Sequence, residues 1–256
     1  IREDGTHTNA HFSESLVSDI CKLIGFKCAE IDIAKRGEDI GCVSYSYLKD
    51  GEEPVDFIAL IQNIRTSFDS KKMIVTDTNE KYDIPLILEA LEEESNTQEE
   101  YNNLKKEFLK SCIVDSLIEH YDRNPSNISI IRRVDRITLA PMYDNGTSLS
   151  ISLPFDVVKE NIEKYGWVEE LRKITKSKIG AGGEKHSNYD KLVEYILSNY
   201  YGDVKDFLDV IDKELTQENM KKILSDEKYR DLDEIYKRLV MKKISINREN
   251  LLVQTK

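Results

Sequence analysis

Hydrophobic residues near the start of the chain recur every three to four positions. This spacing predicts an amphipathic helix over residues 12–24, which Gly25 ends. Two short apolar or β-branched stretches follow, over 28–33 and 40–48, and a charged turn separates them, so they are typical of an antiparallel hairpin. The hydrophobic stripe of the helix consists of Leu16, Ile20, Leu23 and Ile24.

A second helix is predicted to begin directly after Thr97, because Thr97 and Glu100 have the spacing of a capping box. Its apolar stripe continues to about His120. Two short strands, 128–131 and 137–140, then predict a second hairpin. Beyond Pro154 the pattern is almost wholly helical, with predicted segments over 154–164, 189–200, 204–213, 217–224 and 231–241.

These elements predict an α+β fold in two parts. Residues 1–93 form a smaller mixed α/β part, and residues 94–256 form a larger, mostly helical part with an embedded hairpin. A chain of 256 residues with 39% hydrophobic content can bury a substantial core in either one domain or two lobes.

Composition narrows the classes of function. No run of about 18 apolar residues occurs and the first ten residues are polar, so we expect a cytoplasmic protein without a membrane span or secretory signal. The formal net charge of −11 argues against direct binding of nucleic acid. The four cysteines show no CxxC pair, so the sequence predicts neither a zinc site nor a disulfide framework.

The candidate chemistry lies around the second hairpin. Asp122 and Asn127 stand in a polar loop between the long helix and the hairpin, and Asp144 follows the hairpin. Protein-kinase catalytic lobes have the same order of features: a helix, a loop with Asp and Asn five residues apart, a hairpin, and a second Asp. Asp122 is predicted to orient the attacking hydroxyl, and Asn127 and Asp144 to hold Mg²⁺. The alternative is that the loop residues are only turn formers.

The sequence resembles the HipA-like kinases, bacterial Ser/Thr protein kinases best known from toxin–antitoxin modules. The resemblance rests on the apolar helix that ends at Asp122, on the loop to Asn127, and on the segment Leu139-Ala-Pro-Met-Tyr-Asp144, which matches an L-x-P-x-Y-D pattern. It implies a two-lobed protein-kinase-like fold, ATP and Mg²⁺ as cofactors, a protein substrate with a Ser or Thr acceptor, and an antitoxin partner. A small-molecule or lipid kinase and a non-catalytic nucleotide-binding module remain the alternatives.

The resemblance also implies residues that bind the nucleotide. Glu14 corresponds to the helix glutamate that pairs with a nucleotide-binding lysine, although a solvated glutamate is the plainer interpretation. Tyr45 and Tyr47 lie where the family's backbone meets adenine, or else are packing aromatics of a strand. Asn124 is a further candidate nucleotide contact, at a position where the family often has histidine.

The chain departs from the family pattern in one feature, the nucleotide-binding lysine, and the role of one group of arginines stays open. No lysine precedes Lys22, so we expect the nucleotide-binding lysine upstream of Ile1, with Arg2 as a poor substitute. The turn of the second hairpin carries arginines that are either solvated charges or a recognition site for an acidic or phosphorylated segment. These arginines are Arg132, Arg133 and Arg136.

Overall fold

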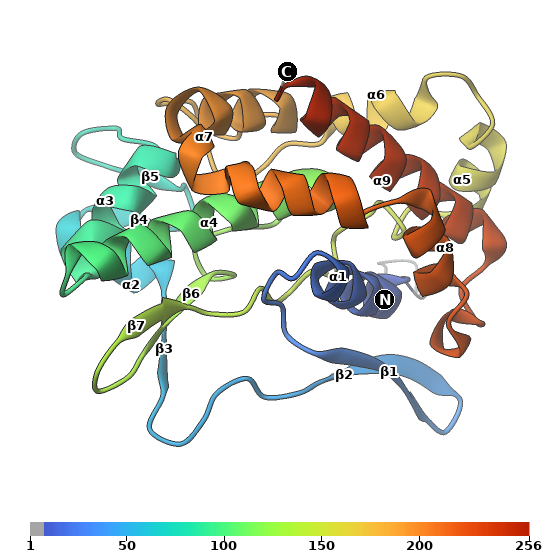
Figure 1. The fold of residues 1–256 in the computed structure, drawn as a ribbon, viewed down its shortest axis with the longest axis horizontal. Helices are drawn as coiled ribbons and strands as arrows, with labels where there is room; N and C mark the ends of the chain where they lie inside the picture. Colours follow the sequence, from blue (N-terminus) through green and yellow to red (C-terminus); the bar gives the residue numbers. More distant parts are fainter. Residues whose placement is uncertain (1–7, 256) are drawn as a thin grey trace.

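The computed structural model describes residues 8–255. Helix α1 (Ala10–Leu23) lies over the hairpin of β1 (Ile31–Arg36) and β2 (Asp39–Ser44), at the lower edge of the molecule in Figure 1. The two strands are antiparallel, as predicted, and Gly37 turns the chain between them with φ +64°. The second strand ends at Ser44, earlier than expected, and residues 45–48 are irregular.

The second hairpin is part of a three-stranded sheet. Strands β6 (Ser129–Arg132) and β7 (Ile137–Leu139) pair as predicted, and β3 (Glu53–Asp56) adds to the far side of β6. The strand order β3-β6-β7 leaves β7 at an edge. The pairing of β3 joins residues early in the chain to the second hairpin.

Two helices and a small strand pair between the hairpins were not predicted. Helices α2 (Phe57–Ile64) and α3 (Ile84–Glu94) flank the pair β4 (Phe68–Asp69) and β5 (Ile74–Val75). Asp56 and Asp83 cap the two helices by accepting from backbone N–H groups three residues on, at 3.0 and 3.1 Å. Helix α3 packs on the long helix α4. The lobe boundary near residue 93 stays a prediction.

Helix α4 (Gln98–Ile118) runs through the middle of the helical part (Figure 1). Thr97 Oγ1 accepts a hydrogen bond from Glu100 N at 3.1 Å, which confirms the predicted helix start. From Phe108 onward nearly every residue of α4 is buried, because α7, α9 and β7 surround it. The helix ends at Glu119, whose φ of +51° lies in the left-handed region.

Between residues 155 and 255 the chain is mostly helical. Helix α8 matches its predicted bounds, α7 spans two predicted helices with a kink at Tyr200, and α9 extends well beyond its predicted end. Helix α6 was not predicted. The helices are α5 (Phe155–Asn161), α6 (Trp167–Ile174), α7 (Tyr189–Glu214), α8 (Gln217–Leu224) and α9 (Glu234–Val253), with the 3₁₀ turn η1 (Glu227–Tyr229) before α9.

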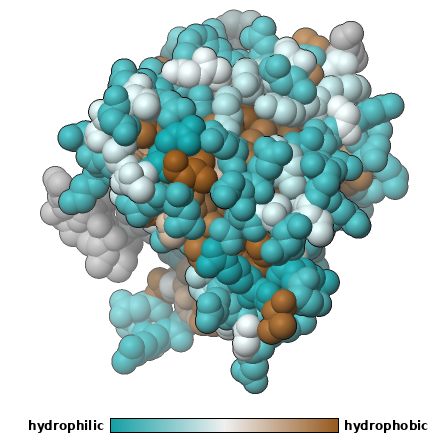
Figure 2. All heavy atoms as spheres, turned by 90° about the vertical axis from the view of Figure 1, so that its left-hand side faces the viewer, coloured by the Kyte–Doolittle hydropathy of each residue, from teal (hydrophilic) through white to brown (hydrophobic). Residues whose placement is uncertain are grey.

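The face in Figure 2 is mainly hydrophilic, with small and separate hydrophobic areas. Among the described helices, none is both long and apolar enough to cross a membrane.

Candidate active site

The loop between α4 and β6 is held by its own polar side chains. Asn127 Nδ2 donates to the carbonyl of Asp122 at 3.0 Å, which leaves Asn127 Oδ1 to accept only from the Ser126 hydroxyl. The side-chain amide of Asn124 also forms hydrogen bonds within the loop: its Nδ2 donates to Asp122, and its Oδ1 accepts from Ser126. Asp122 itself is half-buried. The loop therefore has a fixed shape and presents an oxygen of Asn127.

A buried arginine joins this loop to the segment after β7. Arg123 is 1% exposed and forms two hydrogen bonds with Asp115 of α4, at 3.1 and 2.9 Å. Its Nη1 donates to the carbonyls of Asn127 (3.0 Å) and Tyr143 (2.7 Å), and its Nη2 donates to Asn145 Oδ1 (2.8 Å). One guanidinium thus holds the backbone at Asn127 beside the residues on both sides of Asp144.

Burial governs the ionisation of this pair. Burial raises the pKa of Asp115, and the charge of Arg123 opposes that rise. Burial alone would lower the pKa of Arg123, but the charge and hydrogen bonds of Asp115 outweigh it and raise the pKa above its ordinary value. The guanidinium is therefore charged, and all five of its polar contacts are charge-assisted or directed to carbonyl oxygens.

Asp144 is exposed between two anchored neighbours. Its φ of +55° places an ordinary L-residue in the left-handed region. The next residue, Asn145, is fully buried, and its carbonyl accepts from Ser13 Oγ at 2.8 Å. Glu119, Leu149 and Ser150 also have positive φ. Such backbone strain gathers at functional sites when the surrounding contacts enforce it.

Glu14 reaches the same segment from α1. Its Oε2 accepts from the backbone N–H of Asn145 at 2.9 Å, and a Cβ added at Gly146 would lie 3.2 Å from its Oε1. Burial raises the pKa of Glu14, and the nearby negative charge of Asp144 raises it further, against the hydrogen bond from Asn145. Two carboxylates thus face one region, a setting that favours a cation.

The two tyrosines have different surroundings. The Tyr47 ring stacks on the ring of Tyr143, with the two centroids 6.3 Å apart. Tyr143 is the residue directly before Asp144. Tyr45 is 50% exposed, and its described hydrogen bonds are to Glu30 and Asp32 of the first hairpin region. The structure therefore brings Tyr47 to the site, whereas Tyr45 contacts the hairpin.

The C-terminal end of α4 is fixed from several directions, three residues before Asp122. Side chains of three helices donate to its otherwise unsatisfied carbonyls: Arg172 to Ser116, Asn247 to Leu117, and Tyr189 to His120. The N–H of Leu149 donates to the carbonyl of Ile118. Glu119 and Lys243, both 0% exposed, form a buried ion pair at 2.5 Å.

The donor set suits Mg²⁺ and nucleotide phosphates. Magnesium prefers oxygen ligands and commonly uses one or two protein side chains together with phosphates and water. Asn127 Oδ1 and the exposed carboxylate of Asp144 are oxygens of this kind. Within residues 8–255, no group of three or more His, Cys, Asp or Glu has a metal-binding arrangement. Arg2 lies outside the described residues.

Sequence reasoning missed the roles of Arg123 and Asp115. Arg123 was read only as part of the loop motif, because its partners come together through the fold. A signal was nevertheless present in the segment Ser111-Cys-Ile-Val-Asp115-Ser-Leu-Ile, where a carboxylate interrupts an apolar helix. A charge in such a place needs a buried partner.

No protein-family model matches the chain, and no curated protein matches it. Solved structures do. A Helicobacter pylori proinflammatory kinase, CtkA, aligns with a TM-score of 0.79 at 18% identity, over 97% of this chain and 83% of that one. A chain of the Shewanella oneidensis MR-1 toxin–antitoxin complex of HipA, HipB and operator DNA aligns with a TM-score of 0.60 at 12% identity, over 96% of this chain and 58% of that one. The chain has the HipA-like kinase fold.

Proposed function

We propose that this protein is a cytoplasmic, ATP- and Mg²⁺-dependent kinase that phosphorylates Ser or Thr hydroxyls of a protein. The observation that carries the proposal is the position of Arg123, which holds the Asn127 backbone beside the residues that flank Asp144. The kinase fold supports the same assignment. A nucleotide between the two proposed lobes, 1–93 and 94–256, would meet Glu14 from one side and this loop from the other.

Each residue has a role that follows from its chemistry. Asp122 orients the acceptor hydroxyl and accepts its proton as the oxygen attacks the γ-phosphorus and the bond to the β–γ bridging oxygen breaks. Asn127 and Asp144 would hold Mg²⁺, which neutralises phosphate charge when bound. Glu14 would pair with a nucleotide-binding lysine, and Tyr47 would line the nucleotide end of the site. Tyr45 and Asn124 remain candidate nucleotide contacts.

The test of this proposal is phosphate transfer by the full-length protein. The protein is incubated with Mg²⁺ and ATP labelled on the γ-phosphate, in one arm with lysate proteins and in another with lipid and sugar extracts. Label on Ser or Thr of a protein supports the proposal. Transfer only to lipid or sugar would contradict the protein-kinase assignment, and no transfer to any acceptor would contradict catalysis.

Asp122→Asn isolates the role of the carboxylate, because it keeps the size of the side chain and removes its charge. Transfer is expected to fall by about 10²-fold or more, the scale of a positioned acid–base group, while ATP affinity changes much less. Asp206→Asn, at an exposed position of α7, is the matched control. Normal transfer in a folded Asp122→Asn protein would refute the role.

We also infer a regulatory partner protein of the antitoxin kind, on the basis of the fold. The Shewanella oneidensis structure contains HipB and operator DNA together with HipA. For this chain, isolation of the native protein from its own cells and identification of the proteins that co-purify at stoichiometric amounts tests the inference.

A further inference from the structure

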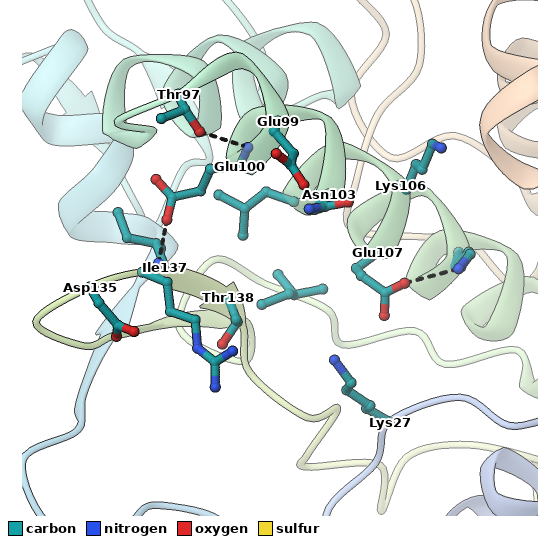
Figure 3. Close-up of a pocket in the computed structure, with 14 residues that line it drawn as sticks. Lys27, Thr97, Glu99, Glu100, Asn103, Lys106, Glu107, Asp135, Ile137 and Thr138 are labelled. Carbon is teal, nitrogen blue, oxygen red and sulfur yellow. Dashed lines mark hydrogen bonds and ion pairs between the residues drawn. The ribbon is translucent and has the colours of Figure 1, made fainter.

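A groove separate from the candidate active site lies between α4 and the β6–β7 hairpin (Figure 3). Its volume is about 490 Å³. The first half of α4 forms one wall, and the turn and strand over residues 135–139 form the other. Lys27, from the segment after α1, points toward α4 across the opening in Figure 3. The buried side chains of Leu104 and Leu139 lie at the base.

Four basic side chains line this groove, although the chain as a whole is acidic. They are Lys27, Lys106, Lys110 and Arg136. Lys110 pairs with Glu107 at 2.9 Å, but the other three form no ion pair with any residue in the range 8–255. Arg136 differs here from the other hairpin arginines, which pair with Glu94 and Glu52. The groove therefore has cations without a described partner.

Four acidic side chains also line the groove, and two of them are already engaged by other groups. Glu100 accepts from the backbone N–H groups of Asn96 and Ile137, and Glu107 is taken by Lys110. Glu99 and Asp135 are the remaining acids of the lining. Figure 3 shows Asp135 at the far end of the groove from Lys27. Among the charged lining side chains that have neither an ion pair nor a backbone hydrogen bond within residues 8–255, three are basic (Lys27, Lys106 and Arg136) and two are acidic (Glu99 and Asp135), an excess that favours an acidic ligand.

The open edge of β7 faces this groove. The hydrogen bonds from Arg133 N to Arg136 O and from Ala140 N to Ser129 O mark the bonded pairs of the β6–β7 ladder. Because such pairs alternate along an antiparallel ladder, the backbone polar groups of Ile137 and Leu139 point away from β6. Glu100 accepts a hydrogen bond from the N–H of Ile137, whereas Leu139 lines the groove. An extended chain can form hydrogen bonds with such an edge.

The groove is connected to the candidate active site through the backbone. Residues 139–144 lead directly from β7 to Asp144. Met142 N donates to the carbonyl of Lys27 at 3.0 Å, and Ala29 N donates to the carbonyl of Met142 at 2.8 Å. A segment bound in the groove would therefore lie beside the strand that carries the site, at a distance that a few residues of extended chain can bridge.

We propose that this groove binds an extended acidic segment of the acceptor protein. Its carboxylates would meet Lys27, Lys106 and Arg136, and its backbone would meet the edge of β7 at Leu139. The identity of the ligand as the acceptor rests on the proposed kinase function, but the binding itself does not.

The first test measures binding without ATP. The probe is a fluorescein-labelled peptide of eleven residues that alternates Glu with Val, and its counterpart has Gln in place of Glu; fluorescence polarisation gives both affinities for the full-length protein. The variant is Lys27→Glu, Lys106→Glu and Arg136→Glu, all at exposed positions. The control variant replaces three lysines elsewhere by glutamate and so has the same change of net charge. These are Lys72, Lys213 and Lys222, whose side chains are 68%, 82% and 68% exposed.

We expect the Glu peptide to bind the wild-type protein at least about tenfold more tightly than the Gln peptide, and the groove variant to lose that preference while the control keeps it. Equal binding of the two peptides, or equal loss in both variants, overturns the proposal. So does a phosphopeptide or a single-stranded RNA that binds the groove more tightly than the Glu peptide does.

The second test measures transfer to a Ser-containing peptide with and without the Glu-Val segment fused to it. The groove variant should raise KM for the fused acceptor at least about tenfold and leave KM for ATP and kcat within about twofold. An unchanged KM overturns the assignment of the ligand as the acceptor. If no acceptor of any kind is phosphorylated but peptide binding behaves as expected, the kinase proposal fails and the groove binds an acidic partner that is not an acceptor.

Discussion

The guanidinium of Arg123 contacts one carboxylate, one amide oxygen and two backbone carbonyls. Its partners lie 8, 4, 20 and 22 residues away in sequence. Under the proposed function it is a positioning residue, because it touches the backbone around Asn127 and Asp144. Its effect on phosphate transfer and its effect on stability can be separated by substitution.

Arg123→Met is expected to cost about 3–5 kcal/mol of unfolding free energy, since it leaves the buried Asp115 unpaired. Adding Asp115→Leu removes that charge and should restore part of the stability, but not phosphate transfer, because the carbonyls of Asn127 and Tyr143 still lack their donor. Urea unfolding and transfer rates measure the two effects. Recovery of transfer in the double variant would show that Arg123 only compensates Asp115.

Glu14 is expected to give a pH-dependent stability difference. Its pKa in the folded state is raised by burial and by Asp144, so ionising it costs more in the folded than in the unfolded state. Glu14→Gln should therefore stabilise the protein near pH 7, and this advantage should disappear as the pH falls through the raised pKa toward the unfolded value of about 4.5. Thermal unfolding of both proteins between pH 4 and 8 tests it; a constant difference would contradict it.

The residues of the site were predictable to different degrees. Asp122, Asn127 and Asp144 can be nominated because their order along the chain is itself the signal. The burial of Asn145 and the approach of Glu14 to its N–H depend on how α1 packs against residues 143–148. No local pattern contains that information, and the roles of the nominated residues remain predictions.

At the level of elements, periodicity decided what could be predicted. The helix over α1, both hairpins and the cap of α4 have clear local signals, and the structure confirms them. Helix α2 was missed because its eight residues are mostly apolar and too few to show a period. Helix α3 had a readable start in Asp83 with Pro85 in its first turn, and that signal was overlooked.

The end of α4 depends on a helix more than 120 residues later. Lys243 of α9 and Glu119 are both fully buried, and Asn247 donates to the same carboxylate at 3.0 Å. Burial lowers the pKa of Lys243, and Glu119 opposes that change. Because Asp122 follows Glu119 closely, α9 supports the conformation of the loop between α4 and β6.

Lys243→Met should destabilise the protein by about 3–5 kcal/mol, because it leaves the Glu119 carboxylate buried without a cation. Glu119→Gln added to it should recover much of that loss, since Gln keeps the oxygen that Asn247 contacts. Urea unfolding provides the measurement, with Lys222→Met as the exposed control, for which little change is expected. A loss no larger than that of the control would show that the pair does not support α4.

For the molecule as a whole, binding of nucleotide should be coupled to stability. Mg²⁺ and ATP at about 100 times Kd should raise the unfolding free energy by about 2.7 kcal/mol. ATP without Mg²⁺ should give less, and Asn127→Ala with Asp144→Ala should abolish the Mg²⁺-dependent part. Thermal unfolding with and without each component measures this. Equal stabilisation by ATP alone would argue against these two residues as metal ligands.

The overall fold is retained although few residues are shared. At 18% identity the CtkA structure still aligns with 97% of the chain. In the sequence, this fold was indicated mainly by the order of the elements around α4 and the second hairpin. The composition and net charge indicated only an acidic chain able to form a core.

The left-handed backbone of Asp144 has an evolutionary consequence. Asparagine and glycine adopt that conformation more readily than most residues, so replacing the aspartate by either would meet little resistance from the backbone and would remove the carboxylate that we propose as a Mg²⁺ ligand. If the proposed function holds, a gene copy released from selection for phosphate transfer would lose that activity here without losing its fold. The residue at this position would then distinguish working kinases from copies that survive as binding proteins.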